Sequence, residues 1–415
     1  MAATARDLDI VVFGAAGFVG RRTAAYLSKR LPEGVRVGLA GRSLERLERV
    51  RAELGPAAAS WPVIVTDADD PKTLAELARR TRVVATTVGP YAKYGMPVVQ
   101  ACVEAGTDYV DLTGEVLFVR DSIDRFDGAA RETGARIVHA CGFDSVPSDL
   151  GVHALYQAAR ADGAGALTDT TAVVRLSGGF SGGTIDSMRT YVDALRRDPA
   201  ARRIARDPYA LSPDPSREPD FGRQSDFVTV DATTVAPGLS GRLAPFVMAS
   251  FNTRVVRRSN ALFGWAYGPR FRYREVMSVG TSRASALSAL AVQAAMGALV
   301  AGMIFPPSRF VLDRVLPAPG QGPSESRGQR GFFIIDLYTT TSSGGRYRGR
   351  VAAQGDPGYQ STPVMLGESA LALVLGGGRI LAEGGVLTPA TAFGEVLTER
   401  LQATGFEITA QRARD

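Results

Sequence analysis

Residues 8 to about 140 alternate short, apolar, β-rich runs with segments whose apolar residues recur at helical spacing. The predicted strands are 8–13, 35–40, 62–66, 82–87, 108–111 and 135–140. The predicted helices between them are 18–30, 43–54, 71–80, 95–105 and 118–133. Such alternation is typical of an α/β, doubly wound parallel sheet. Residues 1–150 are therefore predicted to form an N-terminal Rossmann domain.

The regular alternation stops after residue 147, and residues 207–227 are rich in proline and acid, which predicts a long loop. Apolar, β-branched runs return at 226–235, 332–341 and 346–353, and the pattern becomes helical at 363–376 and 394–403. We predict a mixed α+β substrate or dimerisation domain over 151–383. A C-terminal helical segment, 384–415, is predicted to pack back on the first domain.

Residues 284–305 are almost wholly apolar, interrupted by Ser285, Ser288 and Gln293. The length approaches the ~20 residues that span a bilayer. Nearly half of the segment is alanine or glycine, however, and these residues contribute little transfer free energy. A helix buried in the monomer or in a homodimer interface is the favoured interpretation. Peripheral contact with a membrane is the first alternative, and a single membrane span is the second.

The net charge is +6, and the basic residues are almost all arginine. Pairs such as Arg196-Arg197 and Arg202-Arg203 are either solvated surface, which we favour, or an attraction for an acidic partner. No nucleic-acid-binding signature accompanies them, so nucleic acid is not a predicted partner.

Cys102 and Cys141 are the two cysteines, too few for a disulfide framework or a zinc cluster. His139 and His153 have no metal-ligand spacing, so no metal site is predicted. The N-terminal residues lack the layout of a signal peptide. We expect a cytoplasmic protein, located at the inner face of the cell membrane if residues 284–305 contact lipid.

A glycine-rich loop separates the first predicted strand from the first predicted helix: Gly14-Ala15-Ala16-Gly17-Phe18-Val19-Gly20. Glycines at this turn let backbone N–H groups approach a pyrophosphate, which then lies at the positive end of the helix. The spacing Gly-x-x-Gly-x-x-Gly differs from the commoner Gly-x-Gly-x-x-Gly, but its place between strand and helix favours dinucleotide binding over a plain turn. The predicted cofactor-binding residues here are Gly14, Ala15, Ala16, Gly17, Phe18 and Gly20.

The end of the second predicted strand reads Leu39-Ala40-Gly41-Arg42-Ser43 and carries no acid for a ribose 2′-hydroxyl. Arg42 can instead form charge-assisted bonds to a 2′-phosphate, and Ser43 can add a hydroxyl. We therefore predict NADPH as the cofactor, with an exposed loop charge as the alternative role of Arg42. Asp67, after the third strand, is predicted either to meet the adenine edge or to form a turn.

The fourth strand runs into Val88-Gly89-Pro90-Tyr91, at the sheet edge where a doubly wound fold binds its ligand. Val88, Gly89 and Pro90 are predicted to pass close to the ribose and nicotinamide. Tyr91 and Lys93 are candidate catalytic residues, because a phenol beside an ammonium can donate a proton. Simple packing of the aromatic ring is the alternative, and the commoner outcome on such loops.

Two further segments follow predicted strands and open at the same edge: Asp108 to Glu115, and Cys141 to Asp149. Residues 142–145 are predicted to form the last strand-to-helix loop, with Pro147 in the first turn of the next helix. Asp144 is predicted to cap that helix rather than to catalyse.

These segments together resemble the saccharopine dehydrogenase-like oxidoreductases: Gly-Ala-x-Gly-Phe-x-Gly, Ala-Gly-Arg-Ser, Thr-Val-Gly-Pro-Tyr, Tyr-x-Asp-Leu-Thr-Gly-Glu and Cys-Gly-Phe-Asp-Ser-x-Pro-Ser-Asp. Beyond the Rossmann half, Phe251 to Leu262, Trp265 to Gly268 and Phe271 to Tyr273 resemble the trans-acting enoyl reductases, nearly end to end. The resemblance assigns Gly14, Gly17, Gly20, Arg42 and Ser43 to the cofactor and supplies no catalytic residue.

The resemblance implies a function in polyketide-derived lipid synthesis, where such reductases supply a step missing from a modular synthase of phthiocerol and phenolphthiocerol lipids. A hydride from NADPH would reach the β-carbon of an α,β-unsaturated acyl thioester, carried by an acyl carrier domain, and the α-carbon would then be protonated. Backbone N–H groups of residues 89–91 or 142–145, or Tyr91, are candidates to stabilise the enolate. Two alternatives stay open: a saccharopine dehydrogenase-like reductase of an amino acid or imine, and a lipid-associated protein that binds NADPH without turnover.

Overall fold

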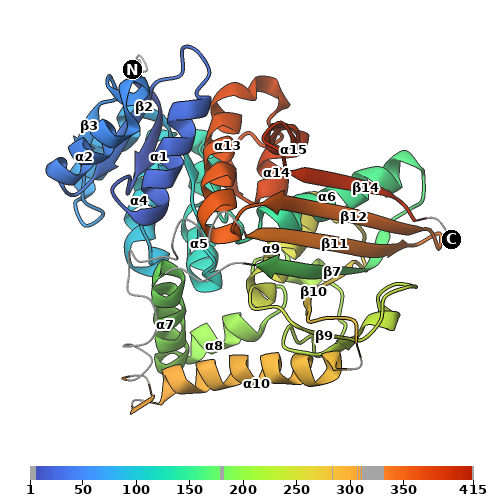
Figure 1. The fold of residues 1–415 in the computed structure, drawn as a ribbon. Helices are drawn as coiled ribbons and strands as arrows, with labels where there is room; N and C mark the ends of the chain where they lie inside the picture. The colour runs from blue at the N-terminus through green and yellow to red at the C-terminus, as the bar shows by residue number, and fades with distance from the viewer. Residues whose placement is uncertain are drawn as a thin grey trace.

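Two seven-stranded sheets form the protein in the computed structural model (Figure 1). The structure describes residues 6–177, 182–282, 284–305, 307–308, 310 and 331–413. The first sheet is parallel throughout, with the order β13-β6-β5-β4-β1-β2-β3. The second sheet is mixed, with the order β14-β12-β11-β7-β10-β9-β8. The predicted α/β class, a doubly wound parallel sheet followed by a mixed part, is confirmed.

The first six strands of the parallel sheet lie where the apolar runs predict them. Their bounds are β1 (Leu8–Phe13), β2 (Val37–Gly41), β3 (Val63–Val65), β4 (Thr81–Thr86), β5 (Asp108–Val110) and β6 (Arg136–Val138). The helices between them are α1 (Phe18–Arg30), α2 (Leu44–Leu54), α3 (Pro71–Arg80), α4 (Tyr91–Ala105) and α5 (Val116–Thr133). Strands β1, β4, β5 and β6 are almost wholly buried, which is why their sequences are continuous apolar runs rather than alternations.

The seventh strand, β13 (Gly385–Leu387), comes from the end of the chain and pairs with β6, where Leu387 lies opposite Val138. Residues 384–415 are therefore not helical throughout. They contain α14 (Pro389–Phe393) and α15 (Glu395–Gln402), but also β14 (Glu407–Arg412), which pairs with β12. A three-residue strand is too short to show periodicity, so only its partner β6 identifies it.

The second sheet forms from scattered segments of the chain. Its strands are β7 (Leu167–Ser177), β8 (Val230–Asp231), β9 (Arg242–Pro245), β10 (Arg272–Ser278), β11 (Phe332–Thr341), β12 (Arg346–Gln354) and β14. The predicted strands 332–341 and 346–353 are β11 and β12, whereas the run 226–235 contributes only two strand residues. The central pair β7 and β10 was not predicted.

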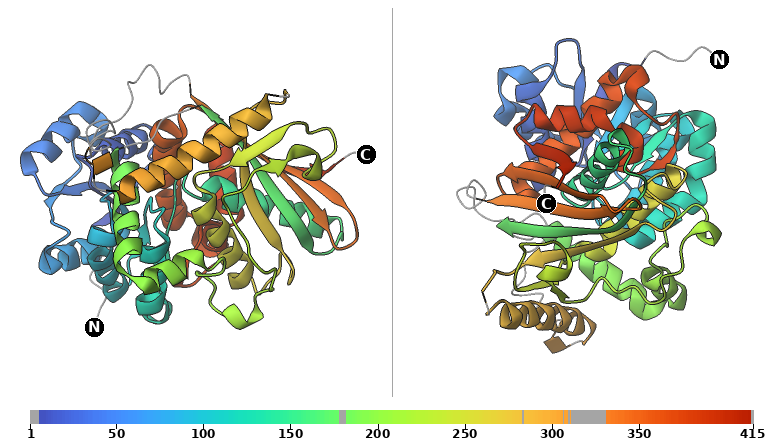
Figure 2. Two further views of the ribbon diagram at one scale, coloured as in Figure 1. Left: turned by 90° about the horizontal axis from the view of Figure 1, so that it is seen from below. Right: turned by 90° about the vertical axis from the view of Figure 1, so that its right-hand side faces the viewer.

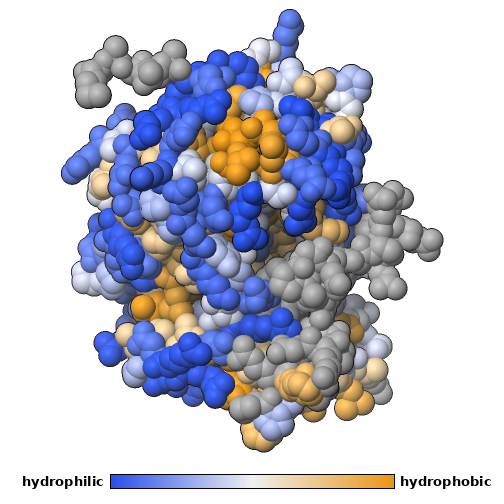
Figure 3. Space-filling view, turned by 90° about the vertical axis from the view of Figure 1, so that its left-hand side faces the viewer, coloured by the Kyte–Doolittle hydropathy of each residue, from blue (hydrophilic) through white to orange (hydrophobic). Residues whose placement is uncertain are grey.

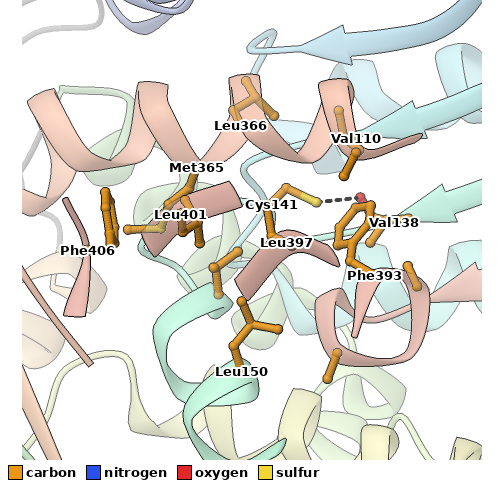
Figure 4. Packing of buried hydrophobic residues seen from close by; sticks show 14 of the residues in the cluster. Val110, Val138, Cys141, Leu150, Met365, Leu366, Phe393, Leu397, Leu401 and Phe406 are labelled. Atoms are coloured by element: carbon orange, nitrogen blue, oxygen red, sulfur yellow. Dashed lines mark hydrogen bonds between the residues drawn. The ribbon is translucent and has the colours of Figure 1, made fainter. Parts of the chain in front are cut away.

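Three helices join the two sheets into one body. The helix α6 (Val146–Ala161) packs on β12 and β14, α9 (Ala249–Leu262) packs on β10, and α13 (Thr362–Leu375) packs on α1 and β4 of the first sheet. Figure 4 shows Leu150 of α6, Met365 of α13 and Leu397 of α15 gathered around Cys141. Apolar residues of both sheets thus share one core.

The segment predicted to be buried or interfacial forms α10 (Ser285–Ile304), which lies on the outer surface beside β9 and α7 (Gly182–Arg197) (Figure 2). The buried residues of α10 are Ser285, Ala289 and Met303, whereas Leu287 is 73% exposed. Burial within the monomer is therefore wrong for this helix. By length and composition α10 is long and apolar enough to cross a membrane. The remaining helix of this region is α8 (Pro199–Arg206).

Candidate cofactor and active site

The glycine loop turns tightly between β1 and α1. Gly14 has φ 87°, and a Cβ there would lie 2.7 Å from Oγ1 of Thr87 and 2.9 Å from Cγ2 of Val88. A Cβ on Gly20 would lie 2.2 Å from the backbone oxygen of Gly14. The loop can therefore pass under the end of β4 only with glycine at both positions. Gly17 is the N-cap of α1 and has no side chain to accept a hydrogen bond from the N–H groups that begin this helix.

A cavity of about 540 Å³ opens beside this loop, at the carboxyl ends of β1, β2, β3 and β4. This volume is ordinary for a site that takes a small molecule or cofactor. The residues that line the cavity are Phe13, Gly14, Ala16, Gly17, Gly41, Arg42, Ser43, Arg46, Asp67, Ala68, Thr87, Val88, Gly89 and Tyr94. The face on the left of Figure 1 is mostly hydrophilic, with apolar residues gathered in one area of its upper half (Figure 3).

Most of the residues predicted for the cofactor lie in this lining: Gly14, Ala16, Gly17, Arg42, Ser43, Asp67, Val88 and Gly89. Ala15, Gly20 and Pro90 are buried behind it. The ring of Phe18 turns away, with its centroid 4.9 Å from that of Tyr359 and the guanidinium of Arg22 3.8 Å above it. Phe18 thus holds α1 against the C-terminal half and can serve a phosphate only through its backbone.

Two arginines give the cavity a positive end suited to a 2′-phosphate. Ser43 caps α2 by accepting a hydrogen bond from the backbone N–H of Arg46 at 3.3 Å. The guanidinium of Arg46 reaches back to within 3.5 Å of the backbone oxygen of Ala16, so it lies between α2 and the glycine loop. Arg42, Arg46 and the positive N-terminal end of α2 therefore all lie at one end of the cavity. Arg46 was not among the residues predicted for the cofactor; its spacing of about one helical turn from Arg42 was the available signal.

Asp67 brings a carboxylate to the cavity from the end of β3, the strand next to β2. Its Oδ1 accepts a hydrogen bond from the backbone N–H of Asp69 at 3.2 Å, which is the turn-forming role. The same side chain also lines the cavity, beside Ala68. The two predicted roles of Asp67 are thus compatible.

Tyr91 does not have the environment of a proton donor. Its hydroxyl donates to the backbone oxygen of Thr86 at 3.1 Å and accepts from the backbone N–H of Leu112 at 3.1 Å, and the side chain is only 5% exposed. Burial raises the pKa of Tyr91 well above its ordinary value. Lys93 points to solvent and lies outside the cavity lining. This environment favours the packing alternative for Tyr91, whose hydroxyl joins the ends of β4 and β5, and a catalytic role of Tyr91 and Lys93 stays a prediction.

Glu115 fixes the start of α4 next to the cavity. Its carboxylate accepts hydrogen bonds from the backbone N–H groups of Tyr91 at 3.0 Å and Ala92 at 2.8 Å. It also accepts one from the hydroxyl of Ser187 in α7 at 2.7 Å. Burial raises the pKa of Glu115. Glu115 thus couples the loop after β4 to a helix of the second half of the chain.

Asp111 holds together the loops that follow β5 and β6. Its fully buried carboxylate contacts four groups: the hydroxyl of Tyr109 at 3.0 Å, the N–H of Thr113 at 3.1 Å, the N–H of Ala140 at 2.9 Å and Nδ1 of His139 at 2.7 Å. This network gives Asp111 and His139 a structural role, because it joins the two loops.

Asp144 departs from its predicted role. The N-cap of α6 is Ser145, which makes no capping bond and instead donates its hydroxyl to Oδ1 of Asn252 at 3.0 Å. The carboxyl group of Asp144 lies between Gly114 and Gly142: Oδ1 is 3.7 Å from where a Cβ of Gly114 would be, and Oδ2 is 2.9 Å from that of Gly142. Burial, helped by the charge of Asp111, raises the pKa of Asp144 to about 7.

Known proteins agree with this site and extend the likeness over the whole chain. Residues 10–138 match the saccharopine dehydrogenase NADP-binding domain. A trans-acting enoyl reductase of Mycobacterium ulcerans is 48% identical over 423 residues, covering 99% of this chain and 100% of that protein. A Mycobacterium tuberculosis protein, whose name assigns the same activity provisionally, is 53% identical over 417 residues, with 99% of each chain covered. The apo saccharopine dehydrogenase (L-Glu forming) of Saccharomyces cerevisiae superposes with a TM-score of 0.55 at 11% identity, covering 98% of this chain and 100% of that one, which shows a shared fold.

Proposed function

Since the chain belongs to the family of trans-acting enoyl reductases, within the saccharopine dehydrogenase-like oxidoreductases, we propose that it reduces the α,β-double bond of an acyl thioester with NADPH. The observation that carries the proposal is the identity of about half of all residues along the full length of both chains. The matched length includes the residues of the second sheet as well as those of the first.

The chain is an NADPH-dependent oxidoreductase, and its cavity has the parts that this cofactor requires. The glycine loop and the start of α1 would hold the pyrophosphate, and Arg42, Ser43 and Arg46 would hold the 2′-phosphate. When bound, NADPH supplies a hydride from its nicotinamide. The backbone of Val88 and Gly89, at the end of β4, would orient that ring toward the loops after β5 and β6.

We further propose that the acyl group arrives on an acyl carrier domain of a polyketide synthase. Carrier domains are acidic, and Arg196, Arg197, Arg203 and Arg206 present exposed positive charge on α7 and α8. Charge complementarity is thus the support for the carrier-domain proposal. A homodimer of this chain is compatible with the proposal.

For location we propose the cytoplasm, with peripheral attachment to the inner face of the membrane through α10. The exposed side chains of Leu287 and Leu290 support lipid contact, and so does the absence of charged residues from Ser285 to Ile304. Apolar residues also appear along the lower edge of Figure 3, at the height of α10 in Figure 1.

Consumption of NADPH by the purified protein tests the proposed reaction. Crotonyl-coenzyme A and a long-chain 2-enoyl thioester serve as hydride acceptors, and lysine mixed with an α-keto acid, which together form an imine, serves as the comparison. Oxidation with thioesters alone supports enoyl reduction. Oxidation with the amine and keto acid alone would establish the rival imine reductase, and NADPH binding without any oxidation would establish a non-catalytic binding protein.

A further inference from the structure

The loops after β5 and β6 bring one carboxyl group to the carboxyl-terminal edge of the first sheet, the same edge at which the cofactor cavity opens. Asp144 is partly exposed, and its two carboxyl oxygens lie over the backbones of Gly114, after β5, and Gly142, after β6. Methionine Met248 approaches the same place, with Cε 3.2 Å from where a Cβ of Gly114 would be. Side chains at either glycine would therefore displace the carboxyl group or the methionine beside it.

The other acidic and polar groups at this edge are already occupied. Asp111 has four polar contacts and no exposure, and Glu115 accepts three hydrogen bonds. The hydroxyl of Tyr91 is satisfied on both sides, and the thiol of Cys141 is buried 3.5 Å from the backbone oxygen of Val138 (Figure 4). Within the residues that the structure describes, no hydrogen bond joins the Asp144 carboxyl group to another residue. Unlike Asp111 and Glu115, Asp144 can therefore donate its carboxyl proton to a ligand.

The strand order places this carboxyl group on the nicotinamide side of the cavity. Arg42 and Arg46, which suit the 2′-phosphate, follow β2, and the lining crosses β1 to Val88 and Gly89 after β4. The next strand in the same direction is β5, about 4.8 Å further on. A cofactor with its 2′-phosphate at the end of β2 and its nicotinamide at the end of β4 would leave the space at the end of β5 for the substrate. Asp144 lies at that position.

We propose that Asp144 is the general acid of the reduction and delivers the proton to the α-carbon of the substrate. This role rests on the proposed enoyl reduction. Hydride addition forms a C–H bond at the β-carbon, and the π electrons of the double bond move through the α-carbon onto the thioester oxygen. The enolate then reforms its carbonyl as the α-carbon takes the proton from the Asp144 carboxyl group, whose O–H bond breaks. The products are the saturated thioester, oxidised cofactor and an Asp144 carboxylate, which regains a proton from solvent.

The electrostatic surroundings suit this role. A pKa of about 7 keeps a large fraction of Asp144 protonated at neutral pH, near the value that general acid catalysis favours. The groups that face it are Asp111, whose charge opposes ionisation, and Tyr91 and Cys141, whose pKa values burial raises so that both stay neutral.

The test compares Asp144→Asn, which keeps the shape and loses the acid, with Asp144→Glu, which keeps the acid. Asp169→Asn is the matched control, because Asp169 is an exposed carboxylate on β7 outside this edge. Rates are measured with crotonyl-coenzyme A as a function of pH, and NADPH affinity is measured separately by fluorescence titration. We expect kcat of Asp144→Asn to fall about 100-fold or more, with NADPH affinity unchanged, partial activity in Asp144→Glu and full activity in the control.

The pH profile gives an independent readout. Because the acid must be protonated, wild-type kcat should be constant below about pH 7 and fall about tenfold per unit above it, whereas the residual rate of Asp144→Asn should not follow this fall. An active wild type with a flat profile, or with undiminished kcat in Asp144→Asn, would overturn the acid role alone. A wild type that reduces no thioester would instead overturn the proposed function, and the role of Asp144 with it.

Discussion

Replacing Arg42 by alanine should convert a strong preference for NADPH into a weak one. Arg42 lines the positive end of the cavity, and within the described residues no ion pair joins its guanidinium to Asp67 or to another carboxylate, so two of its N–H groups can bind one 2′-phosphate. A hydrogen bond between charged groups contributes about 1.5–3 kcal/mol. Because Arg46 lies near the same position and retains part of the attraction, we take about 2 kcal/mol, which corresponds to a roughly 30-fold weaker Kd for NADPH. NADH has no 2′-phosphate, so its affinity should stay within about threefold, since a change below 0.7 kcal/mol is expected.

The assay is a titration of both nucleotides by fluorescence, at one fixed ionic strength because the interaction is between charges. Arg49→Ala is the matched control: Arg49 lies on α2, the helix that follows Arg42, is exposed and pairs with Glu45 on the helix surface. Combining Arg42→Ala with Arg46→Ala should weaken NADPH further and leave NADH unchanged. Equal losses for NADPH and NADH in Arg42→Ala, or no loss of NADPH affinity, would refute the assignment of this end of the cavity to the 2′-phosphate.

Three other substitutions probe separate parts of the structure. Gly20→Ala should abolish NADPH binding and lower the free energy of unfolding by several kcal/mol, because the new Cβ would lie 2.2 Å from the backbone oxygen of Gly14. A variant whose denaturation midpoint is close to that of the wild type would contradict this close packing of the glycine loop. Tyr91→Phe should lower the free energy of unfolding by about 1–3 kcal/mol, because the Leu112 N–H loses its acceptor, and should keep kcat within about threefold. A loss of about 100-fold in kcat without loss of stability would support Tyr91 as the proton donor. Replacing Leu287 and Leu290 together by serine should leave the free energy of unfolding and the rate of NADPH oxidation unchanged but abolish co-sedimentation with vesicles of anionic phospholipid. Vesicle binding that persists in the variant, or wild-type protein that never binds vesicles, would refute lipid contact through α10. A wild-type dimer that dissociates in the variant would show that a second copy of the chain covers α10.

The first sheet could be predicted because each of its early strands is a buried apolar run bounded by a helix. The same reasoning could not find β13, since three residues beside Gly384 acquire strand structure only through β6, more than two hundred positions earlier. The strands β7 and β10 were missed for a related reason: their charged and hydroxyl residues, such as Glu275, look polar in sequence. In the fold, Glu275 is buried and bonded to Tyr273 at 2.7 Å and Asn252 at 2.9 Å.

At the site, residues that act through the backbone were easier to predict than residues that act through side chains. Gly14, Gly17 and Gly89 follow from the turn geometry that a dinucleotide needs. From the sequence we preferred Tyr91 to Asp144 as a catalytic candidate, although both follow a strand at the correct edge, because their contacts cannot be predicted from the sequence. Tyr91 finds two backbone partners, whereas Asp144 finds none among the described residues, and that difference exists only after folding.

The return of the chain to its first sheet has a consequence for biosynthesis. When the ribosome has released residues 1–150, the nascent Rossmann half still lacks β13 at its edge and α13 against α1 and β4. Both pieces emerge only after the whole second sheet except β14 has been made, and β14 itself is the last strand of the chain. Neither half can therefore mature during translation, and a nonsense codon anywhere before residue 385 would leave two incomplete sheets rather than one finished nucleotide-binding domain. We expect the parallel sheet to be completed only when residues 362–387 join it, in one cooperative transition with the second sheet.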